Sequence, residues 1–250
     1  VYDYTARHTL PQINRFRTMD PLSEKYHGIS PYAFCAGDPV NRIDPTGLKD
    51  IEVDQKGEII KNESSPSDTF DSVTVVDDKG SVVASTNIQL NSVNVIPPSE
   101  SSTVKVTEYQ ITGVENATKV FEVLSQSEVE YGICITSPLE SESTDEISTT
   151  NSTVNFITTT HQTDGESKMS GYIKSELSNK YKILEYNHSH PSNTPYPSNF
   201  KNSNGNYVGD IPVYRSLINT LGYDIKCNIF LPGTQTYVNF NPFDKKYDKK

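Results

Sequence analysis

Two segments of the chain carry apolar residues at the spacing of one helix face. The first has apolar residues at positions i, i+3, i+4 and i+7, namely Ala117, Val120, Phe121 and Leu124. Asn116 precedes them and asparagine is a common N-cap, so we expect a helix of about three turns behind it. The second segment repeats the spacing at Tyr214, Leu217, Ile218 and Leu221. Gly222 follows, and because glycine is typical just after a helix end, the second helix is predicted to stop there.

Alternating apolar and polar positions predict strands around these helices. In residues 128–135 apolar side chains alternate with polar or small ones, which is typical of a strand with two different faces. Four further segments have the composition of strands: residues 153–161, 181–190, 223–231 and 236–240. This order of helices and strands favours an α+β or α/β sandwich over residues 116–241, followed by a charged tail at 242–250.

The region from residue 49 to residue 115 is polar and carries two short turn motifs. Each motif is Asp-x-Lys-Gly between β-branched residues, first at residues 54–57 and again at 77–80. Such motifs predict β-hairpins. The Ser- and Pro-rich stretches around them predict linkers, so we expect residues 49–115 to act as a tether, with docking of the two hairpins on another part of the chain as the alternative. Residues 136–153 are rich in Ser, Thr and Glu and are expected to form a long mobile loop.

The composition narrows the classes of function. The chain has 250 residues, of which 34% are hydrophobic, and a formal net charge of −10. A negative net charge is unsuited to neutralising a phosphate backbone, so general nucleic-acid binding is disfavoured. No stretch approaches the roughly 20 apolar residues of a membrane span. Residues 1–10 lack the charged start and apolar run of a secretory signal, so we expect a soluble piece of a longer chain.

The three cysteines, Cys35, Cys134 and Cys227, lie far apart in the sequence. This spacing fits neither a disulfide framework nor a C-x-x-C zinc site. Cys134 and Cys227 lie within strand-like runs, so we expect both thiols to be buried like small hydrophobic side chains.

Two histidines form a candidate metal site. His188 and His190 stand two residues apart at the end of a predicted strand, and Pro191 ends that strand. Alternate strand residues lie on one side, roughly 6.6 Å apart at about 3.3 Å per residue, so both imidazoles can bind one ion. A chance pair of histidines at a strand end stays an alternative. Asp210 precedes the second predicted helix, where it can be an N-cap, a metal ligand or both.

The first 48 residues contain three distinctive motifs: YDYTAR at residues 2–7, SPYA at 30–33 and PVNRIDPTGL at 39–48. Together they resemble the end of the core of Rhs/YD-repeat proteins. The resemblance implies a β-rich remnant of a large repeat shell, followed after Leu48 by an exchangeable effector, usually a toxin. It divides the chain into a core end at 1–48, a polar hairpin and linker region at 49–115, and an effector domain at 116–241.

A second set of motifs lies in the effector region. Residues 188–191 read HSHP, and Ser198 follows eight residues after the second histidine. This arrangement resembles the JAMM (MPN+, JAB-domain) metalloproteases, which carry H-[ST]-H-P and then S-x-x-D. Here the position three after Ser198 is Lys201, and the first aspartate is Asp210, after an insertion at residues 199–209. The resemblance implies a JAB-type, cytidine deaminase-like α+β fold, in which helices flank a mixed sheet.

The JAMM resemblance also implies roles for particular residues. A Zn²⁺ ion would be bound by His188, His190 and Asp210, provided that the insertion loops out. The family carries a catalytic glutamate on an earlier strand, and Glu130, two residues before a glycine, is our candidate. Glu130 would accept a proton from water activated at the metal, and Ser198 would stabilise the developing oxyanion.

Other residues compete for these catalytic roles. Glu128 shares a predicted strand face with Glu130, whereas Glu185 points to the face opposite the histidines. A solvated side chain on an exposed strand face is the alternative for Glu130. A serine-histidine hydrolase is disfavoured because the chain has no G-x-S-x-G motif, and His161 could serve only if the fold brings it close.

Taken together, the two resemblances imply the effector tail of an Rhs-type polymorphic toxin, delivered into a target cell. Its activity would be that of a zinc-dependent peptidase or isopeptidase. The implied partners are a protein substrate, of which ubiquitin-like conjugates are one case, a cognate immunity protein and the Rhs shell of the parent chain. A catalytically inactive JAB-fold binding scaffold and a degenerate structural Rhs terminus are the alternatives.

Overall fold

The computed structural model describes most of the chain after residue 49, in five stretches: residues 50–63, 71–98, 104–139, 153–163 and 168–247. It also describes the backbone of three short strands near the N-terminus, which form an antiparallel sheet: β1 (Tyr2–Tyr4), β2 (Arg7–Leu10) and β3 (Arg15–Phe16). Most of the segment that resembles an Rhs core, including Cys35, lies outside the described residues. The Rhs interpretation therefore stays a prediction.

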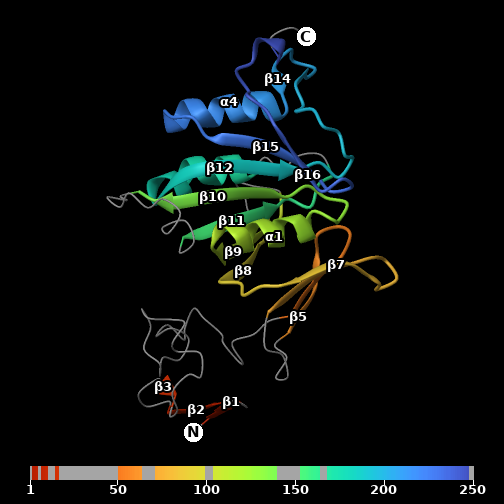
Figure 1. The fold of residues 1–250 in the computed structure, drawn as a ribbon, viewed down its shortest axis with the longest axis vertical. Helices are drawn as coiled ribbons and strands as arrows, with labels where there is room; N and C mark the ends of the chain where they lie inside the picture. The colour runs from red at the N-terminus through yellow and green to blue at the C-terminus, as the bar shows by residue number, and fades with distance from the viewer. Residues whose placement is uncertain are drawn as a thin grey trace.

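A seven-stranded mixed sheet lies at the centre of the described fold (Figure 1), in the order β16-β15-β12-β10-β11-β9-β8. Its strands are β8 (Ser92–Ile96), β9 (Val106–Thr112), β10 (Gly132–Pro138), β11 (Val154–Thr159), β12 (Tyr181–Ser189), β15 (Lys226–Leu231) and β16 (Thr236–Asn239). β12 and β15 run parallel, and the other neighbouring pairs run antiparallel. Each strand segment predicted between residues 128 and 240 contributes to this sheet.

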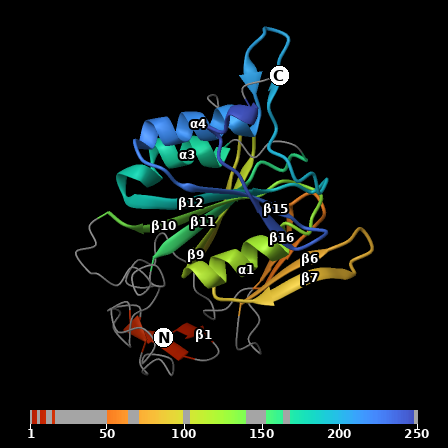
Figure 2. The ribbon, with the colours of Figure 1, turned by 45° about the horizontal axis from the view of Figure 1, so that its top comes forward.

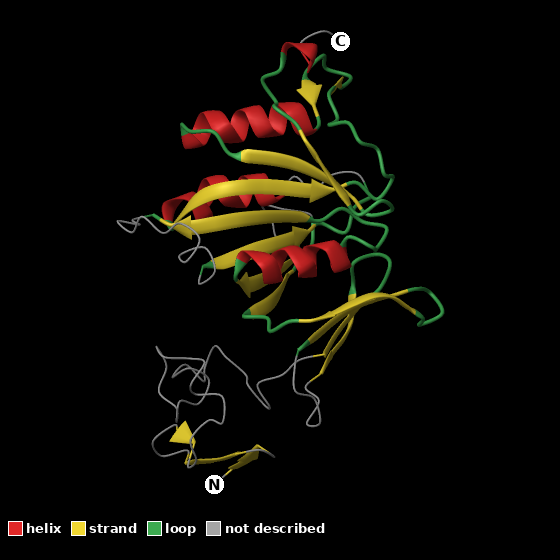
Figure 3. Cartoon of the chain, in the orientation of Figure 1, coloured by secondary structure: helices red, strands yellow, loops and turns green. Residues whose placement is uncertain are grey.

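Helices cover both faces of the sheet (Figure 2). α1 (Val114–Leu124) packs on one face, and α3 (Lys168–Ser175) and α4 (Asp210–Leu221) pack on the other. The structure also has two short 3₁₀ helices, η3 (Leu177–Asn179) and η4 (Lys245–Tyr247). The apolar faces predicted for α1 and α4 are buried, and Gly222 takes the left-handed conformation (φ 77°) that ends α4. Figure 3 separates these helices from the strands by colour and confirms the predicted α+β class.

The helices differ from the prediction in two respects. α1 begins three residues earlier than expected, with Gly113 as its N-cap, and Asn116 lies within its first turn. α3 has no counterpart among the predicted elements, because its buried face rests chiefly on only two apolar residues, Met169 and Ile173. Such a short apolar pattern is a weak signal for a helix.

β10 differs from its prediction in extent and in exposure. It begins at Gly132 and continues to Pro138, into the segment that was expected to be a loop. Neither face is solvated, because Ile133 belongs to the core beneath α1, whereas Cys134 belongs to the core beneath α3 and α4. Residues 140–152, which make up most of the expected mobile loop, lie outside the described residues.

A second sheet has the order β5-β4-β6-β7. Its strands are β4 (Asp50–Val53), β5 (Ile59–Glu63), β6 (Ser72–Val76) and β7 (Val82–Asn87), and both Asp-x-Lys-Gly motifs form the predicted hairpin turns. Ile51, Val53 and Val73 are fully buried in the same core as Phe121 of α1. The described strands β4 and β6 are therefore packed against the helix through these residues. The boundary expected at residue 116 lies within the first turn of α1.

The described cysteines match their prediction. Cys134 and Cys227 are buried free thiols, and burial raises the pKa of Cys227 to about 12. Among the described helices, none combines the length and the apolar character needed to cross a membrane.

Candidate metal centre

The structure brings His188, His190 and Asp210 together on the face of the sheet that α4 covers. The two histidines lie at the end of the central strand β12, and their Nε2 atoms are 3.0 Å apart. Asp210 Oδ1 lies 3.2 Å from His188 Nε2, and Asp210 Oδ2 lies 3.5 Å from His190 Nε2. Within the described part of the chain, these residues form one group whose possible ligand atoms all lie within 4.8 Å of one another.

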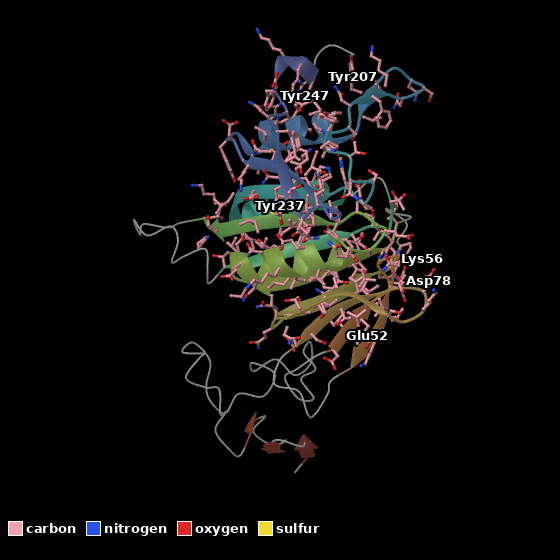
Figure 4. All side chains as sticks on the ribbon, turned by 45° about the vertical axis from the view of Figure 1, so that its right-hand side comes forward. Glu52, Lys56, Asp78, Tyr207, Tyr237 and Tyr247 are labelled. Carbon is pink, nitrogen blue, oxygen red and sulfur yellow. The ribbon has the colours of Figure 1, made fainter. Side chains whose placement is uncertain are left out.

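Asp210 reaches the histidines because the insertion before it loops out as a small hairpin. β13 (Phe200–Lys201) pairs with β14 (Tyr207–Val208), and Figure 4 shows Tyr207 on this projecting hairpin. Asn202 Oδ1 accepts two backbone hydrogen bonds that close its turn. The eleven-residue insertion therefore adds little distance between its two ends, and the condition set for Asp210 as a ligand is met.

Ser198 and Asp210 hold each other through reciprocal hydrogen bonds. The Asp210 N–H donates to Ser198 Oγ (2.8 Å), and the Ser198 N–H donates to Asp210 Oδ2 (2.6 Å). Gly209 is required between them, since its φ is 107° and a Cβ there would lie 2.5 Å from Ser198 Oγ. Asp210 is the first residue of α4 and Gly209 is its N-cap, and the Asp210 carboxylate is held by Ser198 in the loop before the hairpin.

The hydrogen bonds of the two imidazole Nδ1 atoms determine which nitrogens face the centre. The Tyr214 hydroxyl donates its one proton to the Tyr186 carbonyl (3.1 Å), so it must accept from His188 Nδ1–H (3.0 Å). His190 Nδ1 lies 2.7 Å from the Thr194 carbonyl, which can only accept. Both rings therefore carry their proton on Nδ1 and present an Nε2 lone pair to the centre. This outer hydrogen bonding is typical of histidine ligands of metals.

A cation is needed to stabilise this arrangement. Two lone pairs and a carboxylate face one another in a site where His188 is 3% and His190 is 7% exposed. Burial raises the pKa of Asp210, but a positive charge at the histidines and the hydrogen bond from the Ser198 N–H leave that pKa well below its ordinary value. The positive charge is either an extra proton on the histidine pair or a metal ion.

The geometry fits a metal ion of the zinc type. Ligands about 2.0–2.1 Å from a tetrahedral zinc ion stand about 3.3–3.4 Å apart. The two Nε2 atoms are 3.0 Å apart, and each lies near a different oxygen of Asp210, at 3.2 Å (Oδ1) and 3.5 Å (Oδ2), so these separations are close to this value. Two imidazoles and one carboxylate also match the three-ligand set of catalytic zinc sites, which leave one position for water or substrate.

Glu130 lies beside the histidines although it precedes β10. Gly132 lies opposite His188 in the pairing of β10 with β12, and a backbone hydrogen bond to the Tyr131 carbonyl (2.9 Å) continues this register. Two residues before Gly132, Glu130 therefore falls opposite His190. Directly opposed residues of antiparallel strands project to the same face of the sheet, so Glu130 is placed on the face of the metal centre.

The surroundings of Glu130 fit a proton acceptor. Its side chain is buried, at 8% exposure, which contradicts the alternative of a solvated carboxylate. Burial chiefly raises the pKa of Tyr214 well above its ordinary value, and the charges of Asp210 and Glu130 add to that rise. The Glu130 carboxylate, like that of Asp210, is therefore close enough to Tyr214 to raise its pKa. It does not belong to the three-residue group of possible ligands found among the described residues.

The competing candidates lie elsewhere. Glu128 is exposed. Glu185 lies on the opposite face, where it accepts a hydrogen bond from Asn228 (2.7 Å). His161 is engaged with Thr107 (3.0 Å), at the junction with the four-stranded sheet.

Sequence patterns did not reveal the groups that orient the histidines. Tyr214 fits the apolar face of α4, and nothing in its spacing distinguishes a structural tyrosine from one that binds a histidine. The Thr194 contact uses a backbone carbonyl, which carries no sequence signal. A tyrosine, rather than leucine or isoleucine, among the buried positions of α4 is the one available hint, because buried hydroxyl groups need hydrogen-bond partners.

Comparison with known proteins agrees with this site. The model of a family described as JAB-like toxin 1 matches residues 109–212, which run from β9 into α4 and include all three candidate ligands. The match supports a JAB-like toxin domain, and the mixed α+β architecture is consistent with it. A toxin effector is the class of protein that this match indicates. Neither the curated proteins nor the solved structures gave a match.

Proposed function

We propose that this chain is the effector tail of an Rhs-type polymorphic toxin and that its JAB-like domain is a zinc-dependent peptidase or isopeptidase. The observation that carries the proposal is the buried cluster of His188, His190 and Asp210, in which both Nε2 lone pairs and a carboxylate converge. A buried cluster of this polarity binds a cation in preference to remaining empty. The JAB-like toxin match supports the same assignment.

Each residue around the cluster has its own proposed role in catalysis. Bound zinc would supply a Lewis acid that polarises a substrate carbonyl and lowers the pKa of water. Glu130 accepts the proton of the attacking water and returns it to the leaving amine. Ser198 Oγ accepts the Asp210 N–H, which leaves its own proton to donate to the developing oxyanion. Tyr214 holds the His188 ring in the orientation that keeps Nε2 directed at the centre.

The context of the domain is part of the proposal. The motifs in residues 1–48 resemble an Rhs core end, so the parent chain would supply a shell from which the effector is delivered into a target cell. The proposed substrate is a protein, with ubiquitin-like conjugates as one case. A cell that makes such an enzyme needs a cognate immunity protein. Zinc chemistry at the cluster can be tested before the identity of either partner is known.

Elemental analysis tests the ligand set. We expect one zinc ion per chain in the purified protein and a loss of zinc in His188→Ala and in Asp210→Asn. Circular dichroism of each variant checks that the fold is retained. Equal zinc content in the native protein and both folded variants, or no zinc in any of them after purification in zinc-containing buffer, would contradict the proposed site.

A matched pair of glutamate variants tests the proton acceptor. Glu130→Gln should keep zinc and abolish both growth arrest and host-protein cleavage when the chain is expressed in a sensitive bacterium. Glu128→Gln, which changes an exposed carboxylate two residues away, should keep zinc and activity. Toxicity that is undiminished in both Glu130→Gln and His190→Ala would favour the inactive binding scaffold.

A further inference from the structure

The turn between β4 and β5 is packed against the chain segment that carries Glu130. The Glu128 N–H donates to the Gln55 carbonyl over 2.9 Å, which joins the loop before β10 of the seven-stranded sheet to the turn between β4 and β5 of the four-stranded sheet. The turn itself is rigid, because Asp54 Oδ1 accepts the backbone N–H groups of Lys56 (2.9 Å) and Glu58 (2.8 Å). Figure 4 shows Lys56 at the position where the four-stranded sheet meets the rest of the chain.

Gly57 makes the closest approach of this turn to the segment. A Cβ at Gly57 would lie 2.8 Å from Val129 Cγ2, 3.0 Å from the Tyr131 hydroxyl and 3.3 Å from His161 Nδ1. Val129 and Tyr131 are the two immediate neighbours of Glu130 in the chain, and both are buried. A side chain at position 57 would collide with Val129 and crowd Tyr131, so only glycine allows the turn to pack against both chain neighbours of Glu130.

The opposite side of the segment is held by the end of β11 and the residues after it. The Glu130 N–H donates to the Gln162 carbonyl (2.8 Å), and the Glu130 carbonyl accepts from Thr159 Oγ1 (2.8 Å). His161, between these two residues, has its Nδ1 atom 3.1 Å from the Lys56 carbonyl. The turn and the β11 end thus enclose the Glu130 backbone from two sides and also contact each other.

We propose that the β4–β5 turn, residues Asp54–Glu58, is a positioning element for Glu130, and that Gly57 is its positioning residue. Residues 128–131 precede β10 and lack the full strand pairing that fixes His188 in β12, so this segment relies for its geometry on the turn together with the end of β11. The inference rests on the proposed role of Glu130 as the proton acceptor. It makes the four-stranded sheet part of the catalytic unit, so that displacing this sheet would switch the enzyme off without touching the metal ligands.

The second Asp-x-Lys-Gly turn provides a matched control. Gly57 and Gly80 occupy the same place in equivalent turns, and their φ angles are 73° and 78°. A Cβ at Gly80 would meet no atom within 4 Å, whereas one at Gly57 would collide with Val129. Alanine at either position has the same backbone strain, so the difference between the two variants isolates the contact with the Glu130 segment.

Hydrogen exchange of backbone amides in the full chain tests the inference without any substrate. Gly57→Ala should raise the exchange rates of the Glu128 and Glu130 amides about tenfold or more over those in Gly80→Ala, because the Glu128 amide loses the Gln55 carbonyl and the displaced segment moves the Glu130 amide away from the Gln162 carbonyl. Adding Val129→Ala to Gly57→Ala removes the colliding methyl group and should return part of this protection. Equal rates in Gly57→Ala and Gly80→Ala would overturn the proposal.

Kinetics and zinc content separate a positioning role from a purely structural one. Displacing a proton acceptor by about 1 Å lowers turnover about a hundredfold, so Gly57→Ala should lower kcat about tenfold to a hundredfold with little change in KM. It should keep the zinc content of Gly80→Ala. If the native chain has no activity, the proposed function fails while the exchange experiment still decides the docking of the turn. If the native chain is active and both glycine variants match it, the positioning inference fails alone.

Discussion

The most discriminating prediction concerns Tyr214→Phe, which removes one oxygen atom behind the metal centre. The Tyr214 ring is fully buried and stacks on Tyr186 with ring centroids 4.8 Å apart, and Phe240 packs against its other side at 5.0 Å. Phenylalanine keeps all of this packing. The substitution therefore changes only the two hydrogen bonds of the hydroxyl, to His188 Nδ1 and to the Tyr186 carbonyl.

The expected magnitude follows from those two bonds. A buried polar group that loses its partner costs about 1–3 kcal/mol, and here the Nδ1–H of His188 and one carbonyl are both affected. Loss of an outer partner of a metal-binding histidine typically weakens metal binding about 10–100-fold, or about 1.4–2.8 kcal/mol. We expect Tyr214→Phe to weaken zinc binding by this factor while the protein stays folded, because the His188 ring is no longer fixed in the Nδ1–H form.

Competition titration against a chelator of known zinc affinity measures this change. Tyr237→Phe is a suitable control, because its hydroxyl donates to Glu122 (3.1 Å) on the face of the sheet that carries α1, away from the cluster. Figure 4 labels Tyr237 for comparison. The control should bind zinc like the native protein. Native affinity in Tyr214→Phe would refute the inference that this hydroxyl sets the tautomer of His188.

Three further outcomes test the packing and the metal site. Phe121→Ala should lower the free energy of unfolding by about 3–5 kcal/mol in urea titrations, because the ring is fully buried between both sheets; a loss below about 1 kcal/mol would contradict that core. In a Cys35→Ser variant, Ellman's reagent should leave Cys134 and Cys227 unmodified until the protein unfolds, because both thiols are buried. Zinc removal by a chelator should lower Tm reversibly, since zinc present at a thousandfold its Kd adds about 4 kcal/mol; an unchanged Tm would count against a bound metal.

The helices α1 and α4 and the hairpin turns could be predicted because the residues that specify each of them lie close together in the sequence. The apolar spacing of α1 and α4, the glycine that ends α4 and the two Asp-x-Lys-Gly turns all depend on contacts between near neighbours in the chain. The pairing of His188 with His190 is also local, since a strand places alternate residues on one face. Elements with short or mixed apolar patterns, such as α3, gave too weak a signal.

The extent of the packed unit could not be predicted from composition. Residues 50–98 are polar enough to resemble a tether, yet Ile51, Val53 and Val73 lie on the one face that packs on α1. A small sheet buries only alternate residues, so its mean composition stays polar even when it is folded. Which partner covers that face is a question of contacts between residues far apart in the sequence.

The sequence by itself determined the ligand types and the position of the two histidines, because imidazoles on alternate strand residues converge whatever surrounds them. Only the tertiary structure decided the rest of the centre. Asp210 joins because the hairpin before it closes, Glu130 joins because β10 pairs with β12, and Tyr214 fixes a tautomer from the neighbouring helix. Asp210, Glu130 and Tyr214 each lie at least 20 residues from the nearer histidine in the chain. Their geometry is set by the packing of the sheet and its helices, which no local pattern of residues contains.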